Sequence, residues 1–283
     1  MITMHLQRLQ PYWDWRAAGN FVCGGAGAGL LAFTAVCAPA TMATTVLMIA
    51  GLALVALGLT LVWLEIGRPL RALNVFVQLR RSWMSREALA AVVLFALGLG
   101  LLAGLRWGGW PIALAALAFL YCQARILGAA LAIPAWREPL TVPLMVLTGL
   151  AEGAGLFWLL AAWQHPPLVL AAPLGALVVL RWVLWSAWRA RLRRHAPAAA
   201  LQAIAANAPA IQWIGGVLPL ALVGLGVTGI AGAAGSAALI AAAGAAAAAG
   251  GALFKHCLIT RAAFHHGISL PRMPVRGVPR SAA

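Results

Sequence analysis

The sequence predicts an all-α integral membrane protein with eight transmembrane helices. Of its 283 residues, 64% are hydrophobic and only 9% are charged. Soluble domains carry roughly 25% charged residues, so most of this chain must face lipid or other apolar helices. Membrane β-barrels need alternating apolar and polar residues, which the sequence lacks, and open sheets cannot satisfy their backbone in lipid. Helices are therefore the expected spanning elements.

Eight apolar runs have the length of a membrane-spanning helix, because about 20 residues cross roughly 30 Å of hydrocarbon. The runs cover residues 17–37, 45–66, 88–105, 111–133, 140–162, 168–188, 208–231 and 236–258. We expect one polytopic membrane domain over residues 1–260 and a basic, irregular tail over residues 261–283. Small residues such as Gly25 and Gly29 predict close packing between helices.

The distribution of basic residues predicts the orientation. The chain has 20 Lys and Arg residues against five acidic ones. Because successive spans run in opposite directions, their ends form one set on each side of the membrane. All the basic residues except Arg106 lie in or near the same set of ends. The positive-inside rule then places both termini in the cytoplasm. The preference for Arg over Lys and the high Ala content suggest a GC-rich bacterial genome, and we expect the chain in the bacterial cytoplasmic (inner) membrane. Because the charge is spread along membrane edges, the pattern does not favour nucleic-acid binding.

The histidines and cysteines give no sign of a metal centre. The four cysteines are widely spaced without a CxxC motif, and the six histidines lie in loops, in the tails or near a helix end. A membrane cytochrome needs pairs of histidines facing each other within the bilayer. We therefore expect neither haem nor an iron–sulfur cluster in this chain.

Two charged residues, Arg125 and Glu152, fall inside apolar runs that are consecutive in sequence. Burying either charge alone in lipid would be costly, so we expect a buried ion pair between them. If this pair bound a substrate or a proton, the chain would instead be a multi-helix transporter or proton-coupled permease. A broken helix or an inverted repeat would favour that alternative.

Two of the five acidic residues, Glu65 and Glu87, bracket one basic segment. Glu65 ends the second apolar run and Glu87 opens the third, while Asn20 lies at a similar depth in the first. We expect these three residues to converge, with Arg68 nearby, and such carboxyl groups are suited to proton exchange. A simpler alternative is that Glu87 caps a helix and that Glu65 pairs with Arg68.

The same segment resembles a motif of the NrfD/DmsC/PsrC family, the membrane anchor subunits of molybdopterin oxidoreductases. The matching residues are Glu65-Ile66-Gly67-Arg68-Pro69 and Ser82-Trp83-Met84-Ser85-Arg86-Glu87, and residues 13–29 also look like the family's first helix. Family members have a histidine where this chain has Glu65. A finer similarity is to anchors of phenylacetyl-CoA:acceptor oxidoreductase-type enzymes.

The resemblance implies a haem-free anchor that passes electrons between the membrane quinone pool and a partner iron–sulfur subunit. That subunit would exchange electrons with a catalytic subunit that carries molybdopterin and molybdenum or tungsten. The quinone would be ubiquinone or menaquinone. The residues that would bind it and exchange protons with it are Asn20, Glu65, Arg68 and Glu87. The partner subunits would lie on the cytoplasmic side. The basic loop residues Arg71, Arg80, Arg81 and Arg86 would dock the iron–sulfur subunit. An anchor without any quinone contact is the remaining alternative.

Overall fold

The computed structural model describes residues 7–39, 42, 44–65, 74–76 and 78–266. Within these residues, eight helical segments are long and apolar enough to cross a membrane, which confirms the predicted fold class. The segments are Trp15–Cys37, Thr45–Leu64, Trp83–Leu102, Trp110–Gly128, Thr141–Gln164, Leu168–Leu192, Ala198–Val227 and Gly232–Arg261.

Several spans consist of more than one helical element. The first comprises α1 (Trp15–Gly19), the π-helical turn η1 (Asn20–Gly24) and α2 (Gly25–Cys37). The next four are α3 (Thr45–Glu65), α4 (Trp83–Leu102), α5 (Trp110–Gly128) and α7 (Thr141–Ala161). The short helix α6 (Pro134–Arg137) precedes α7, and the 3₁₀ turn η3 (Ala162–Gln164) continues it. The last three are η4 (Leu168–Leu170) with α8 (Ala171–Leu192), then α9 (Ala198–Gln212) with η5 (Trp213–Val217) and α10 (Leu218–Val227), and finally α11 (Gly232–His256) with η6 (Cys257–Arg261).

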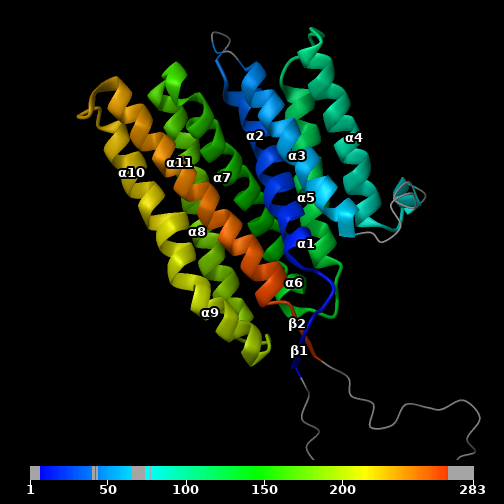
Figure 1. Ribbon diagram of the computed structural model, residues 1–283. Helices are drawn as coiled ribbons and strands as arrows, with labels where there is room; N and C mark the ends of the chain where they lie inside the picture. The colour runs from blue at the N-terminus through cyan, green and yellow to red at the C-terminus, as the bar shows by residue number, and fades with distance from the viewer. Residues whose placement is uncertain (1–6, 40–41, 43, 66–73, 77, 267–283) are drawn as a thin grey trace, which may run out of the picture.

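The first span occupies the centre of the bundle. It is the most buried of the eight, and α2 packs against α3, α5 and α7. Figure 1 shows α3, α4 and α5 on one side of α2, and α7, α8, α10 and α11 on the other. The polar residues Asn20 and Thr34 of the first span are accordingly buried in the protein interior.

Glycines allow the central helices to approach closely. A Cβ atom on Gly29 of α2 would overlap the backbone of Gly149 in α7, and one on Gly153 would overlap the backbone of Gly29 and Leu30. The packing predicted from the small residues is thus found between α2 and α7. In lipid, where apolar surface gives no drive for helix association, such close contact supplies much of the attraction.

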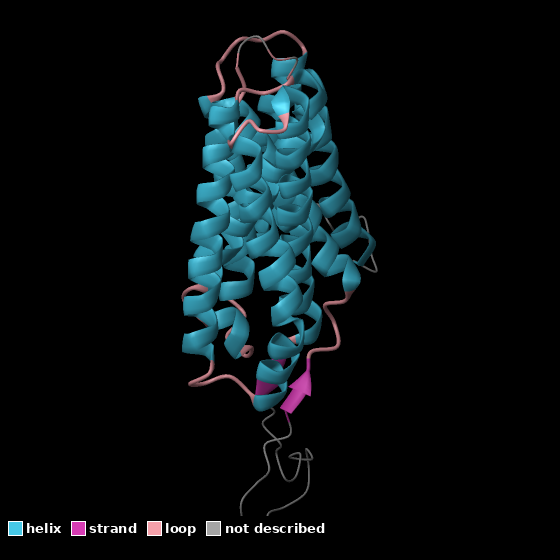
Figure 2. Cartoon of the chain, turned by 90° about the vertical axis from the view of Figure 1, so that its left-hand side faces the viewer, coloured by secondary structure: helices cyan, strands magenta, loops and turns pink. Residues whose placement is uncertain are grey.

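The two ends of the described chain meet at one end of the bundle. Strand β1 (Gln7–Leu9) pairs with β2 (Phe264–His266) in antiparallel register, with Arg8 opposite His265. Figure 2 shows both strands below the same helix ends. With an even number of spans, both ends of the described chain must lie on the same side of the membrane. That this side is the cytoplasm remains a prediction.

Some boundaries differ from the expected ranges. The seventh span begins at Ala198 rather than at residue 208, because residues 198–206 are mostly strong helix formers and the Asn207 amide donates to the Ala203 carbonyl (2.8 Å) within the helix. The third span begins at Trp83, where the Ser82 hydroxyl accepts a hydrogen bond from the Ser85 N–H and caps α4. Within the predicted irregular tail, residues 264–266 form β2, and residues 267–283 lie outside the described part.

Candidate functional site

A cavity of about 280 Å³ lies beside the first span, close to the bundle end that carries the two strands. Most of its walls are apolar or aromatic, and Asn20 and Glu87 contribute the polar side chains. It is lined by Trp13, Ala17, Asn20, Phe21, Val62, Met84, Glu87 and Ile126. This combination of an apolar cleft with a few convergent polar groups is typical of small-molecule sites.

Asn20 reaches the cavity from the first residue of the π-helical turn η1. Its side chain is buried, and Oδ1 has no hydrogen-bond partner among the described residues. The side chain of Gln123 in α5 donates from Nε2 to the Asn20 backbone carbonyl at 3.2 Å. π-Helical turns are rare and often occur at functional sites, because the extra residue redirects the side chains of the helix.

Glu87 reaches the same cavity from the beginning of α4, one turn after the Ser82 cap. The carboxyl group is buried, with the side-chain amides of Gln123 and Asn20 beside it. Its Oε1 atom is enclosed and has no hydrogen-bond partner in the described part of the chain. The structure thus brings Asn20 and Glu87 together, as expected, and adds Gln123, which sequence analysis did not place in this site.

The other two expected site residues are not described at the side-chain level. Glu65 is the last residue of α3, and its side chain and the whole of Arg68 lie outside the described residues, as does Arg71. Val62, one turn before Glu65, lines the cavity. The convergence expected for Glu65 and Arg68 therefore stays a prediction.

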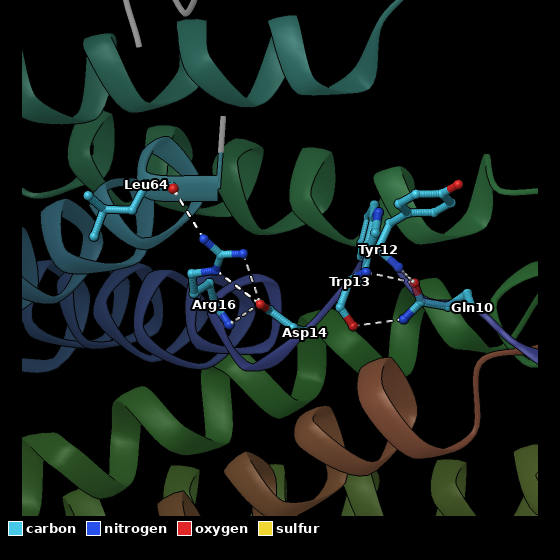
Figure 3. Close-up of polar contacts among 6 residues, drawn as sticks. All are labelled: Gln10, Tyr12, Trp13, Asp14, Arg16 and Leu64. Atoms are coloured by element: carbon cyan, nitrogen blue, oxygen red, sulfur yellow. Dashed lines mark hydrogen bonds and ion pairs between the residues drawn. The ribbon is translucent and has the colours of Figure 1, made fainter. Parts of the chain in front are cut away.

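The end of α3 is tied to the start of the first span by Arg16. Its guanidinium donates to the Leu64 carbonyl at 3.2 Å and pairs with Asp14 at 3.0 Å (Figure 3). Asp14 in turn caps α1 by accepting from the Arg16 N–H at 2.8 Å. Hydrogen bonds from Arg16 hold the pKa of Asp14 below its ordinary value. This contact fixes the spacing of two helices that line the cavity.

Three arginines of the predicted docking loop are described. Arg80 and Arg81 are exposed, while Arg86 donates to the backbone carbonyls of Leu79 (2.9 Å) and Arg80 (2.8 Å). The Arg86 guanidinium also lies over the Trp83 ring, 4.3 Å from its centroid. Arg86 thus folds the end of the loop onto α4, which leaves Arg80 and Arg81 as the arginines with free surface.

The predicted ion pair between Arg125 and Glu152 is wrong. Arg125 lies over the Trp83 ring at 4.7 Å from its centroid, and its Nε is buried without a hydrogen-bond partner. Glu152 of α7 instead pairs with Lys255 of α11, at 2.5 Å between Oε2 and Nζ. The reason is helix packing, because α7 packs extensively on α11. The transporter alternative thereby loses the pair on which it rested.

Arg181 of α8 completes a buried charged cluster with Glu152 and Lys255. Its guanidinium donates to the carbonyls of Ala247 (2.8 Å) and Gly215 and acts electrostatically on Glu152. The sequence-based expectation that every basic residue except Arg106 lies in or near the cytoplasmic helix ends included Arg181 and Lys255, and for these two it is wrong. Their positions inside the apolar runs VVLRWVL and ALFKHCLI were the signal that they lie in the interior.

Comparison with known proteins identifies the family. Residues 19–190 match the family model described as DMSO reductase anchor subunit (DmsC). The chain belongs to the DMSO reductase anchor family. The match covers more than half of the chain, includes Asn20, Glu87 and Gln123, and ends before Lys255. It confirms the resemblance found in the sequence. No curated protein matches the chain.

Family membership and the eight spans establish a multi-pass membrane anchor subunit of a molybdoenzyme complex. Among the described residues, no group of three or more His, Cys, Asp or Glu side chains has a geometry that could hold a metal ion.

Proposed function

We propose that the Asn20–Glu87 cavity is a quinone site, and that the chain exchanges electrons between the membrane quinone pool and a partner iron–sulfur subunit. The observation that carries this proposal is the pair of buried acceptor atoms, Asn20 Oδ1 and Glu87 Oε1, which have no hydrogen-bond partners among the described residues. Buried polar atoms without partners are rare and call for a ligand or water.

The residues present fit a quinone. The ring requires an apolar slot, which Phe21, Met84 and Trp13 help to form. The oxidised ring has carbonyl oxygens, which accept hydrogen bonds and to which a protonated Glu87 carboxyl group can donate. The reduced ring has hydroxyl groups, which can donate to Asn20 Oδ1 and to the Glu87 carboxylate. A bound quinone supplies two-electron, two-proton chemistry.

The protein's own contribution is position and proton exchange. Glu87 is the group in this cavity that can both give up and take back a proton, and Gln123 holds the Asn20 carbonyl so that η1 keeps its shape. The lining is mostly apolar, so among the described residues that line it few side chains can carry a proton. Glu65 and Arg68 belong to the same proposal, as second polar groups at the mouth of the site.

The partners proposed for this chain are an iron–sulfur subunit and a molybdopterin catalytic subunit on the cytoplasmic side. Arg80 and Arg81, exposed beside the cavity-bearing end of α4, are the described residues best suited to dock an acidic surface. Arg71 and Arg86 extend this basic loop, although Arg86 is already bound to the loop backbone.

The test is a mild-detergent purification of the tagged chain from its native host. Iron, molybdenum or tungsten, and extractable quinone are measured in the eluate. For the unmodified protein, we expect stoichiometric iron, either molybdenum or tungsten, and bound quinone. For Glu87→Gln, we expect the same iron and heavy-metal content but the loss of most of the quinone. If the unmodified protein is purified with iron and the heavy metal but without quinone, the proposed quinone site is contradicted. The chain would then be an anchor that does not contact quinone.

A further inference from the structure

A further cavity, of about 210 Å³, lies between α8 and α9, at the bundle end that carries the two strands (Figure 1). Two of its lining residues are arginines and the others are aliphatic. It is lined by Arg189, Leu192, Arg193, Leu201, Ile204 and Ala205. The cavity therefore combines positive charge with an apolar wall, and none of these residues lines the Asn20–Glu87 cavity.

The two arginines lie on the same face at the end of α8. They are four residues apart, and the Arg193 backbone N–H donates to the Arg189 carbonyl at 3.3 Å, so the helical turn includes both. The Arg189 guanidinium lies over the Trp185 ring, 5.5 Å from its centroid. Like charges at this spacing repel each other, and Arg193 acts electrostatically on Arg189 in this sense. An anion bound beside both groups would relieve the repulsion.

The described part of the chain supplies no carboxylate to these arginines. Glu138, the acidic residue at the end of α8, is bound by Arg191 at 2.7 Å and by His195 at 3.2 Å. The other ion pairs among the described residues use Arg16 and Lys255 as their cations. The positive charge of Arg189 and Arg193 is therefore available to an anion from outside the chain.

The depth of the cavity favours a lipid as the source of that anion. Arg189 lies one turn inside the sixth span, which ends at Leu192, and Arg193 follows directly after it. The cavity thus lies where hydrocarbon gives way to head groups, a level at which arginine side chains extend toward phosphate. An acidic protein surface or a free phosphate ion would use the arginines alone, whereas a phospholipid would use the aliphatic wall as well.

We propose that this cavity binds the head group of an anionic phospholipid. Arg189 and Arg193 contact the phosphodiester, and Leu201 and Ala205 contact the first methylene groups of the acyl chains. Basic pockets between membrane helices are typical sites for such head groups. The bound lipid lowers the repulsion between the arginines and joins α8 to α9. This site is separate from the Asn20–Glu87 cavity, so it does not depend on the proposed quinone function.

The test is photolabelling of the purified full-length chain in phosphatidylcholine vesicles. One sample contains a trace of photoactivatable phosphatidylglycerol and the other a trace of photoactivatable phosphatidylcholine. Mass spectrometry measures the label on residues 192–205, which join α8 to α9. We expect the anionic probe to label this segment several-fold more strongly than the zwitterionic probe. Unmodified phosphatidylglycerol should remove this label, and inorganic phosphate should not.

Substitutions then assign the label to the cavity. The double variant Arg189→Gln, Arg193→Gln should reduce labelling by phosphatidylglycerol by about ten-fold or more, since each arginine near a membrane surface adds to the binding of anionic lipid. Arg194→Gln is the matched control, because this exposed arginine lies beside Arg193 but does not line the cavity. It loses the same charge and should keep the label.

Four results would overturn the proposal. Equal labelling by the two probes would mean that the anionic head group is not recognised, and competition by inorganic phosphate would indicate a site for a free anion. Label that persists in the double variant, or falls equally in Arg194→Gln, would also contradict it. If the double variant fails to fold, the two probes and the competition on the unmodified chain decide. A double variant that keeps the label but loses iron from the purified complex would assign the arginines to a protein partner instead.

Discussion

Lys255 and Glu152 form an ion pair at 2.5 Å although 103 residues separate them in the sequence, and both side chains are almost completely buried. The pair joins α11 to α7, the helix that also packs on the central α2. Gly251, one turn before Lys255, leaves the space that the Glu152 carboxylate occupies, because a Cβ atom there would overlap Oε1. The two helices are thus shaped around this pair.

Removing the two partners should have unequal effects on stability. Glu152→Gln leaves Lys255 and Arg181 as two buried cations without a counter-charge, and we expect a loss of about 3–5 kcal/mol. Lys255→Met leaves Glu152 facing Arg181, so we expect a much smaller loss. Thermal unfolding of both variants in detergent measures the difference. Equal destabilisation by the two variants would contradict the assignment of Arg181 to the cluster.

The contact between α2 and α7 should depend on Gly153. A methyl group at this position would overlap the backbone of Gly29 and Leu30, which cannot move away as a side chain could. We expect Gly153→Ala to destabilise the chain by about 1–3 kcal/mol. Gly224→Ala in α10 is the matched control, since nothing lies within 4 Å of a Cβ atom there. A thermal midpoint for Gly153→Ala equal to that of the control would mean that the helices pack less closely than described.

The sequence predicts the elements of this fold well, because spans in lipid are set by length and apolar content. It also predicts that Asn20 and Glu87 meet, since both begin spans at the same depth and the early spans are neighbours. A polar residue in an apolar run, such as Gln123, is expected to face the protein interior, but the sequence does not show which of the interior polar residues it meets. The helix-to-helix contacts that pair Glu152 with Lys255 depend on crossing geometry, which hydropathy does not contain.

The cap of α1 should weaken in acid. The pKa of Asp14 is lowered by hydrogen bonds from Arg16, so its carboxylate stabilises the folded state above the ordinary aspartate pKa of about 3.9. This contribution is lost as the pH falls through the lowered value. We expect faster hydrogen exchange in residues 15–19 at such acid pH. Asp14→Asn keeps a capping oxygen but cannot titrate, so its exchange should show no corresponding step, and a step of equal size in that variant would contradict the assignment to Asp14.

Docking of the iron–sulfur subunit should depend on Arg80 and Arg81. Both are exposed in the described part of the loop before α4, so a double change to Glu reverses charge without removing buried contacts. We expect iron in the purified complex to fall several-fold, as disrupted charge complementarity slows association. Arg106→Glu is the control, because this exposed residue lies in the loop between α4 and α5, at the other end of α4. Equal iron loss from the control would indicate general damage.

The central claim, that quinone binds between Asn20 and Glu87, is tested most directly by photolabelling. The complex is irradiated with an azidoquinone, and the labelled peptides are identified by mass spectrometry. The account predicts label on residues that line the cavity, chiefly Trp13, Phe21 and Met84, competition by unmodified quinone, and loss of label in Glu87→Gln. Competed label that lies elsewhere in the bundle and persists in Glu87→Gln would contradict it.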